Sequence, residues 1–341
     1  MSRLFKNDYS ELGHSRILSA LNKYSSEQNV PYGLDYHSAN AKRYILDIFD
    51  SKDGEVFFLA GGTQTNMVFI SSCLRHYEGV ISCTTGHINV HETAAVEGAG
   101  YKIITVPGRD GKLHKEDVEE VMNIYQDAHM VKPAMVYISN STEIGTIYSH
   151  KELKQLHEIC KKHHLYLFID GARLGAAITS NENDLEAREY GSLCDAFYVG
   201  GTKNGLLYGE ALVINNKELA SNFRYHIKNK GAMLAKGYAL GIMFEEAFKD
   251  GLYFELAKHS NDEAQYLYQA LLELKVDVAP SSTNQLFAKF DKKIANHLMK
   301  EFGLEKWDET DKYIEVRFVT SFLTSHDDVD TLISEIKRLL H

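Results

Sequence analysis

The sequence has few of the residues that would assign it to a disulfide-rich or metal-binding class. Among its 341 residues are only four cysteines. None of them forms a C-x-x-C pair, so neither a zinc knuckle nor a dithiol redox site is indicated. We expect the four thiols to be reduced and mostly buried. They are Cys73, Cys83, Cys160 and Cys194.

Long apolar runs and an excess of positive charge are also missing. No run approaches the length of a transmembrane helix, and the first eleven residues are polar, without the apolar core of a signal peptide. The formal charge is -10 and the pI about 5.9, which argues against a nucleic-acid or anionic-membrane partner. We therefore expect a soluble cytoplasmic protein whose partner is a small molecule.

Apolar runs and helical patterns alternate from about residue 54, without internal repeats or low-complexity linkers. The helical pattern at residues 150–164 is the clearest. Several of the runs are apolar on both faces, as strands of a parallel sheet are, so we expect an α/β fold with a mostly parallel central sheet. The expected strands are 56–59, 80–83, 103–106, 135–138, 165–169, 196–199 and 211–214.

The pattern changes near residue 251, which suggests a second, smaller unit. A long helical pattern at 253–275 is followed by strand candidates at 285–290 and 313–319 and a last helix at 329–340. This order fits a small α+β domain. We predict an N-terminal arm at 1–31, a large domain at 32–250 and a small C-terminal domain at 251–341.

Two segments placed where strands end carry the clearest chemistry. Asp170 begins Asp-Gly-Ala-Arg, and Lys203 ends Gly-Gly-Thr-Lys. In an open α/β sheet both would converge at the carboxyl ends of the strands. A lysine can form a Schiff base with the aldehyde of pyridoxal phosphate, while a carboxylate keeps the pyridine nitrogen protonated. Each residue alone could be a helix cap or a solvated lysine, but together they favour this cofactor.

A glycine-rich turn after the first expected strand supports a phosphate ligand. The run Gly-Gly-Thr-Gln-Thr-Asn opens a helix at residues 61–66, where bare amides and hydroxyls can approach an anion. It matches neither the P-loop nor the G-x-G-x-x-G pattern, and a Gly-Gly turn alone is more often just a turn.

Two histidines follow the next strand. His87 is placed to lie on the face of a pyridine ring, and His91 shares its helical face four residues on. A zinc site needs a third ligand, which is not evident, and H-x-x-x-H lacks the glutamate of the zincin patterns. We therefore predict no metal.

With these motifs the chain resembles the threonine aldolase and aromatic amino acid β-eliminating lyase family, within the fold-type I pyridoxal-phosphate enzymes. The match runs from about residue 32 to 317. It implies a transferase-like large domain and a homodimer or homotetramer. It also implies a role for each matching residue: phosphate binding by Gly62, Thr63 and Asn66, ring stacking by His87, the pyridinium partner Asp170, the Schiff-base residue Lys203 with its neighbour Thr202, substrate-carboxylate binding by Arg173 and Arg317, and a loosely aligned basic residue near the phosphate, Lys228.

The chain departs from the family pattern at three places. Residues 7–11 read Asn-Asp-Tyr-Ser-Glu in place of Ser-Asp-Thr-Val-Thr, and the carboxylate contact that the resemblance implies for this segment is assigned to Ser10. A histidine of the family is replaced in the neighbourhood of Thr142 and Glu143, and Gly-Thr-Lys stands where Leu-Ser-Lys is usual.

The resemblance implies retro-aldol cleavage of L-threonine, L-allo-threonine or a related β-hydroxy amino acid to glycine and an aldehyde. The proton acceptor for the hydroxyl is expected to be His87, with His91 or Glu92 behind it. Because the same apparatus can cleave Cα–H, β-elimination is the alternative. A catalytically silent cofactor-binding protein is a further alternative, and a nicotinamide dehydrogenase has no glycine fingerprint to support it.

Overall fold

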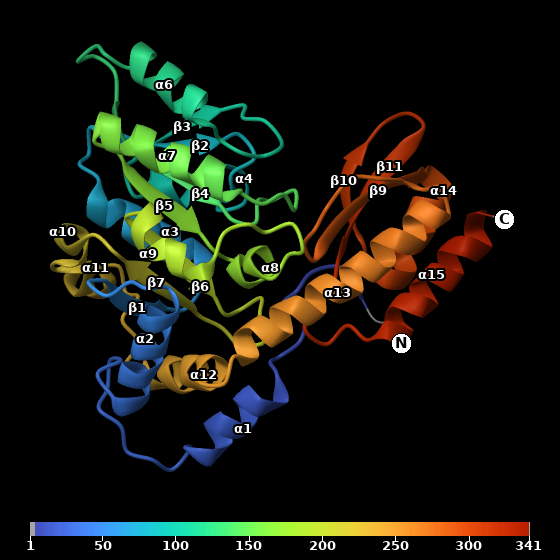
Figure 1. The fold of residues 1–341 in the computed structure, drawn as a ribbon, viewed down its shortest axis with the longest axis horizontal. Helices are drawn as coiled ribbons and strands as arrows, with labels where there is room; N and C mark the ends of the chain where they lie inside the picture. Colours follow the sequence, from blue (N-terminus) through green and yellow to red (C-terminus); the bar gives the residue numbers. More distant parts are fainter. Residues whose placement is uncertain (1–3, 341) are drawn as a thin grey trace.

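The computed structural model describes residues 4–340 and divides them between two sheets. In Figure 1 a large sheet wrapped by helices lies beside a smaller sheet, and the long helix α13 (Leu252–Glu273) runs from one to the other. The expected α/β class, with a mostly parallel sheet and a small α+β part, is confirmed.

The large sheet has seven strands in the order β1-β7-β6-β5-β4-β2-β3. Only β7 runs antiparallel to its neighbours β1 and β6, and the other pairs are parallel. All seven expected strands are present. Their bounds are β1 Glu55–Leu59, β2 Glu78–Cys83, β3 Lys102–Val106, β4 Lys132–Ser139, β5 Tyr166–Asp170, β6 Ala196–Gly200 and β7 Glu210–Ile214.

The sheet is buried on both faces, which explains why its strands are apolar at consecutive positions. In β6, Phe197 and Val199 belong to one hydrophobic cluster, whereas Ala196 and Tyr198 belong to a second cluster on the other side. Alternate side chains of one strand therefore fill two separate cores. Helices cover these faces: α3 Gly62–Cys73, α4 His87–Val90, α5 Ala95–Gly98, α6 Lys115–Ile124, α7 His150–His163, α8 Leu174–Ile178, α9 Tyr190–Leu193, α10 Lys217–Ala220, α11 Phe223–Asn229 and α12 Tyr238–Phe248, with a short 3-10 turn at Ala187–Glu189.

The small sheet is antiparallel, in the order β10-β11-β9-β8. The expected strands at 285–290 and 313–319 are β9 (Gln285–Asp291) and β11 (Tyr313–Val319). The sequence did not predict β8 (Asp277–Val278) or the polar β10 (Glu305–Glu309). Two helices besides α13 pack here, α14 (Lys292–Phe302) and α15 (His326–Leu340).

The N-terminal segment contacts both parts of the molecule. Phe5 lies in the small-domain core, and its carbonyl accepts a hydrogen bond from the backbone of Val319. Ile17, in α1 (Ser15–Lys23), belongs to the core of the large sheet, and α1 and α2 (Tyr36–Ile48) pack on α12. The exact domain bounds remain predictions, since α13 contributes residues to both cores.

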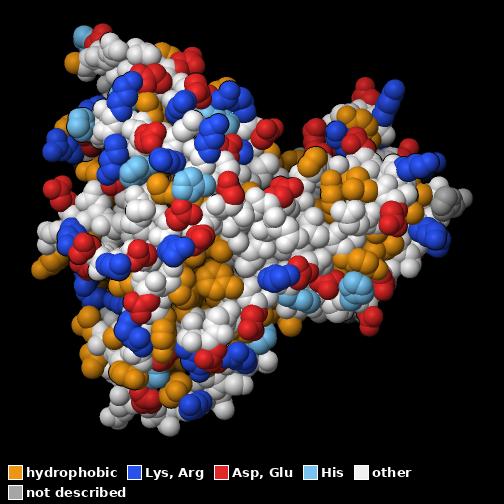
Figure 2. Space-filling model, viewed as in Figure 1, with side chains coloured by type: hydrophobic (Ala, Val, Ile, Leu, Met, Phe, Trp, Pro, Cys, Tyr) orange, Lys and Arg blue, Asp and Glu red, His pale blue; other side chains and the backbone are white. Residues whose placement is uncertain are grey.

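Charges of both signs are mixed over the surface. On the face seen in Figure 2, Lys and Arg side chains alternate with Asp and Glu over both parts of the molecule. Within residues 4–340, no helix is both long and apolar enough to cross a membrane.

Candidate active site

A cavity of about 600 Å³ opens at the carboxyl end of the parallel strands, between the large sheet and the small domain. Its wall combines loops of the large sheet with strands β10 and β11, so that residues far apart in sequence face one ligand-sized space. Among the residues that line it are His87, Glu143, Arg173, Lys203, Glu305 and Arg317.

Two glycines allow the ends of β5 and β6 to approach closely. A Cβ at Gly171 would lie 1.8 Å from the carbonyl oxygen of Tyr198, and one at Gly200 would lie 2.2 Å from that of Ala172. The amide of Gly200 donates to the carbonyl of Gly171 over 2.9 Å. This contact fixes the turn after Asp170 against the turn that leads to Lys203.

Asp170 is buried and surrounded by hydrogen-bond donors. The hydroxyls of Tyr137 (2.5 Å) and Tyr198 donate to its two carboxylate oxygens, as do the side-chain amide of Asn66 (3.0 Å) and the backbone of Ala172 (3.0 Å). Burial by itself raises the pKa of this carboxyl, but His87 and the side-chain donors outweigh it, so the pKa is lowered. Asp170 is therefore an anion held in place.

His87 is linked to Asp170 through two other side chains. Its Nδ1 lies 2.8 Å from Glu92, and the amide of Asn66 donates to both Glu92 (2.7 Å) and Asp170. The ligand atoms of His87, Glu92 and Asp170 lie within 4.8 Å of one another, close enough for a metal. However, the Asn66 N–H already occupies the space between the two carboxylates, and a cation would have to displace it.

Lys203 lines the cavity next to the strand end that carries Asp170. Burial and the charge of Arg173 lower the pKa of its amine, and Asp8, Asp170 and Glu210 partly offset this. A lowered pKa makes the neutral, nucleophilic amine available.

Glu210, at the start of β7, is a neighbour of Lys203 that the sequence analysis missed. Its carboxylate accepts hydrogen bonds from the Thr202 hydroxyl (2.8 Å) and the Gly201 amide (2.9 Å), and burial raises its pKa to about 7. The only signal in the sequence was an acidic residue beside an apolar strand. The hydroxyl of Thr202 thus supports the turn that carries Lys203.

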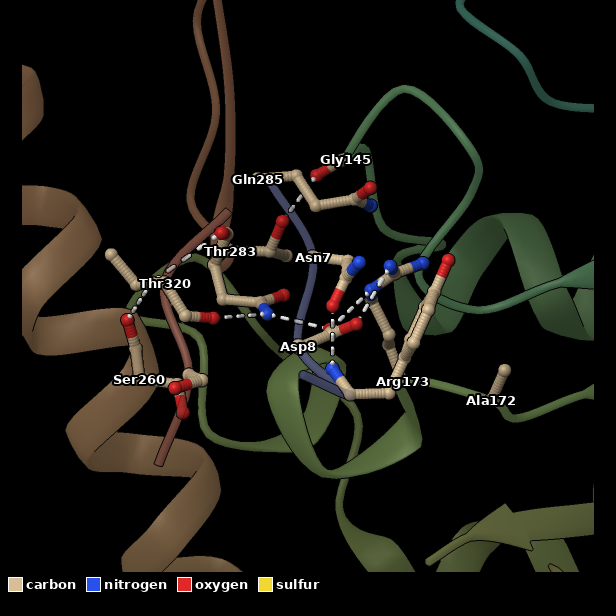
Figure 3. Close-up of polar contacts among 12 residues, drawn as sticks. Asn7, Asp8, Gly145, Ala172, Arg173, Ser260, Thr283, Gln285 and Thr320 are labelled. Carbon is tan, nitrogen blue, oxygen red and sulfur yellow. Dashed lines mark hydrogen bonds and ion pairs between the residues drawn. The ribbon is translucent and has the colours of Figure 1, made fainter. Parts of the chain in front are cut away.

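Arg173 is held by an acidic residue of the N-terminal segment. Its Nε and Nη2 atoms donate to the Asp8 carboxylate at 2.7 and 3.0 Å, and Figure 3 shows this pair, with Asp8 between Arg173 and residues of the small domain. The amide of Asn284 also donates to Asp8 (2.9 Å). The segment 7–11 therefore does reach the site, through Asp8, which matches the family pattern, and through Tyr9, which departs from it and lines the cavity.

Arg317 comes from β11 and lines the same cavity. Its Nη2 is paired with Glu305, its Nη1 lies 3.3 Å from the side-chain oxygen of Gln285, and its guanidinium lies 5.5 Å from the ring centre of Trp307. Both predicted carboxylate-binding arginines therefore line the same cavity, and each already contacts a protein carboxylate.

The predicted phosphate turn forms the start of α3, a helix of 12 residues. The first amides of a helix have no partner within it, which suits an anion. A Cβ at Gly62 would lie 3.0 Å from the Tyr198 hydroxyl, and Thr63 is exposed at the turn. Asn66 is placed differently from the expectation: its amide faces Asp170 and Glu92, under the turn.

Ser10 and Lys228 do not line the cavity, and neither contacts the hydrogen-bonded groups around Asp170 and Glu210. Ser10 is exposed, and its hydroxyl donates to Asn7 (2.8 Å), although the adjacent Tyr9 lines the cavity. Lys228 is exposed on α11, with its amine 5.5 Å from the ring centre of Tyr32. The structure does not bring these two residues to the other candidates within one chain.

The residues present fit pyridoxal phosphate. The donors around Asp170 keep it ionised against the burial that would neutralise it, and Lys203, whose pKa is lowered, supplies a free amine on the cavity wall. The open N-terminus of α3 provides anion-binding amides. These are the three chemical functions that the cofactor requires.

Known proteins agree with this reading. The profile of the β-eliminating lyase family matches residues 16–293. The low specificity L-threonine aldolase of Pseudomonas sp. (strain NCIMB 10558) is 33% identical over 75% of this chain and 74% of its own length, and that of Escherichia coli (strain K12) is 28% identical over 76% of each.

Solved structures extend the agreement to the whole chain. The threonine aldolase of Leishmania major superposes with a TM-score of 0.98 at 41% identity and covers 99% of this chain and 100% of its own. An aromatic amino acid β-eliminating lyase/threonine aldolase from Exiguobacterium sp. 255-15, at 16% identity and a TM-score of 0.76, shares the fold. The chain therefore belongs to the β-eliminating lyase and threonine aldolase family of fold-type I pyridoxal-phosphate enzymes.

Proposed function

We propose that this protein is a pyridoxal-phosphate-dependent carbon–carbon lyase that cleaves L-threonine, L-allo-threonine or a related β-hydroxy amino acid to glycine and an aldehyde. The observation that carries the proposal is the convergence of Lys203, His87 and two arginines on one cavity, with the buried Asp170 linked to His87 through Glu92 and Asn66. The threonine aldolase relatives, matched over most of their length, support this choice of substrate.

Lys203, Asp170, His87 and the start of α3 would hold the cofactor, with Gly62 and Thr63 at the phosphate. When bound, pyridoxal phosphate accepts the electron pair of a bond broken at the substrate Cα. The protein decides which bond that is by orienting the substrate. Arg173 and Arg317 supply guanidinium groups that can grip its carboxylate from two sides and so set the direction of the Cα–Cβ bond.

Cleavage also requires an acceptor for the proton of the β-hydroxyl. The O–H electron pair becomes part of the new carbonyl, the Cα–Cβ pair passes to Cα, and Cα then takes a proton to give glycine. His87 is our first candidate acceptor and His91 the second, since both line the cavity, whereas Glu92 acts behind His87. Glu143 is a further acidic group on the same wall, and its Oε1 accepts the backbone N–H of His87 over 3.0 Å.

Product analysis tests the proposal. The purified protein, loaded with pyridoxal phosphate, is given L-threonine, L-allo-threonine and L-serine while its visible spectrum is recorded. Glycine with acetaldehyde from the threonine isomers is expected. Pyruvate or 2-oxobutyrate with ammonia would instead identify a β-eliminating lyase, and a bound chromophore without any product would identify a silent cofactor-binding protein.

We also propose that the active form is a homodimer or homotetramer in the cytoplasm. Large apolar side chains are exposed on the two segments that meet at Lys228. Its amine lies over Tyr32 (40% exposed), Leu34 (61%) follows two positions later, and Tyr225 (76%) stands on the same helix as Lys228. A second copy docked there would bury them and would give Lys228 a route to the phosphate site of its partner. The four cysteines are free, with Cys73 half-buried and the other three buried, as suits a reducing compartment.

A further inference from the structure

The two cavity arginines are paired with protein carboxylates of very different burial. Arg173 pairs with Asp8, whose side chain is 1% exposed, whereas Arg317 pairs with Glu305, whose side chain is 45% exposed. The arginines themselves are alike, at 12% and 13%. The two ion pairs therefore differ in how easily the carboxylate can separate from its arginine, since only Glu305 has water beside it.

Asp8 is built in. Besides the two hydrogen bonds from Arg173, it accepts one from Asn284, whose amide also donates to the carbonyl of Thr320 (3.0 Å). Figure 3 shows Asp8 between the large-domain arginine and the small-domain segments. Burial opposes its charge, but Arg173, Lys203 and the hydrogen bonds outweigh burial and lower its pKa, so Asp8 stays ionised.

Asp8 binds one edge of the Arg173 guanidinium, and within residues 4–340 the other edge makes no hydrogen bond. A guanidinium has five N–H groups. Two of them, one on Nε and one on Nη2, donate to Asp8. The remaining Nη1 and Nη2 groups form a second fork, suited to a second carboxylate. Asp8 thus fixes the plane of the guanidinium without occupying its binding edge.

Glu305, in contrast to Asp8, is half-exposed to water. It stands on β10, at the edge of the small sheet and on the rim of the cavity, and it contacts Nη2 of Arg317. The Nε of Arg317 is buried without a hydrogen-bond partner among the described residues, so this guanidinium has unused capacity. A half-exposed carboxylate holds an arginine only weakly, because water competes for both charges.

We propose that Asp8 is a positioning residue, a permanent counter-ion that orients Arg173, and that Glu305 is a resident competitor that the substrate carboxylate displaces from Arg317. The inference rests on the proposed role of the two arginines. It predicts that removing the charge of Asp8 weakens carboxylate recognition, whereas removing the charge of Glu305 strengthens it.

The test compares Asp8→Asn and Glu305→Gln with the wild type. Glycine and glycinamide differ in the carboxylate, and both are titrated into the loaded enzyme while the visible absorbance of the cofactor is followed. The quantity of interest is the dissociation constant of glycinamide divided by that of glycine. The difference in amine pKa between the two ligands cancels when this ratio is compared between variants. A loss of structure would weaken both ligands equally and leave the ratio unchanged.

In Asp8→Asn we expect glycine to bind about 30-fold more weakly or worse, with the ratio falling by a similar factor and KM for L-threonine rising more than kcat falls. In Glu305→Gln we expect glycine to bind about two- to fivefold more tightly, with a higher ratio. An unchanged ratio in either variant, or a lower one in Glu305→Gln, overturns the inference.

Two further results keep the test decisive. If Asp8→Asn does not fold, Asn284→Ala is used instead, because it removes one donor from Asp8 and keeps the ion pair with Arg173. The ratio is then expected to fall by less than for a lost charge, and an unchanged ratio overturns the role of Asp8.

If the wild type itself does not distinguish glycine from glycinamide, the arginine clamp of the proposed function fails. That outcome is separate from a clamp that works but does not depend on Asp8.

Discussion

At the scale of single residues, the site depends on buried groups whose charge is set by their neighbours. Lys203 is the clearest case, because burial and the nearby Arg173 lower the pKa of its amine. For Lys203→Ala we expect loss of covalent cofactor attachment and a fall in L-threonine cleavage of about 10³-fold or more, since the nucleophile is gone.

Borohydride reduction followed by mass spectrometry of peptides checks this prediction. The wild type should carry the reduced cofactor on the peptide that contains Lys203 and nowhere else. A labelled peptide from another region, or full activity in the variant, would refute the assignment. Lys236→Ala is the matched control, because Lys236 is an exposed lysine outside the cavity.

Glu210 gives a pH-dependent prediction at the same scale. Burial raises its pKa from 4.5 to about 7 in the folded protein. Between these values the folded state binds more protons than the unfolded state, so stability falls as pH rises. Glu210→Gln abolishes this titration, and its thermal midpoint relative to the wild type should be higher at pH 8 than at pH 5.

Thermal unfolding of the cofactor-free protein at the two pH values measures the difference. Cofactor-free protein is used because the cofactor would compete for Lys203, the charged neighbour of Glu210. A constant offset between the variant and the wild type across the range would show that Glu210 does not titrate in this window.

At the scale of elements, the site is positioned by the close contact between the ends of β5 and β6. Gly171→Ala would place a Cβ 1.8 Å from the Tyr198 carbonyl, a backbone atom that cannot rotate away. We expect the variant to be destabilised by about 3 kcal/mol or more. The cofactor site should suffer as well, because Asp170 and Lys203 flank this contact.

Gly61→Ala is the control for that substitution. A Cβ at Gly61 meets nothing within 4 Å, and its φ of -174° is accessible to any residue. We expect a stability change within about 0.5 kcal/mol. Urea unfolding of the cofactor-free proteins separates the two outcomes, and equal midpoints would mean that the strand contact does not require glycine.

At the scale of the whole molecule, the exposed apolar side chains around Leu34 and Tyr225 predict self-association. For Leu34→Glu and Tyr225→Glu we expect a shift towards monomer, because a charge at a buried interface is costly. Light scattering after size exclusion measures the mass. Ile124→Glu on α6, an apolar site elsewhere whose exposure (55%) is close to that of Leu34, should leave the assembly unchanged.

Much of this protein was determined by its sequence alone. The seven strands of the large sheet are found where consecutive apolar residues predicted them, because strands buried on both faces carry a strong local signal. Asp170 and Lys203 could be singled out because they stand at strand ends, and a parallel sheet gathers such ends at one edge. The polar strand β10 was missed for the corresponding reason: its residues alternate little between apolar and polar and leave no period to detect.

Only the tertiary structure decided which groups meet there. Asp8 reaches Arg173 across 165 positions of sequence, and Glu305 reaches Arg317 because β10 pairs with β11. Neither pairing has a local signature, since an acidic residue on a polar stretch reads as solvated until the chain is folded around it. Burial then sets the charges of Asp8, Lys203 and Glu210, and burial is a property of the packed molecule that no short stretch of sequence carries.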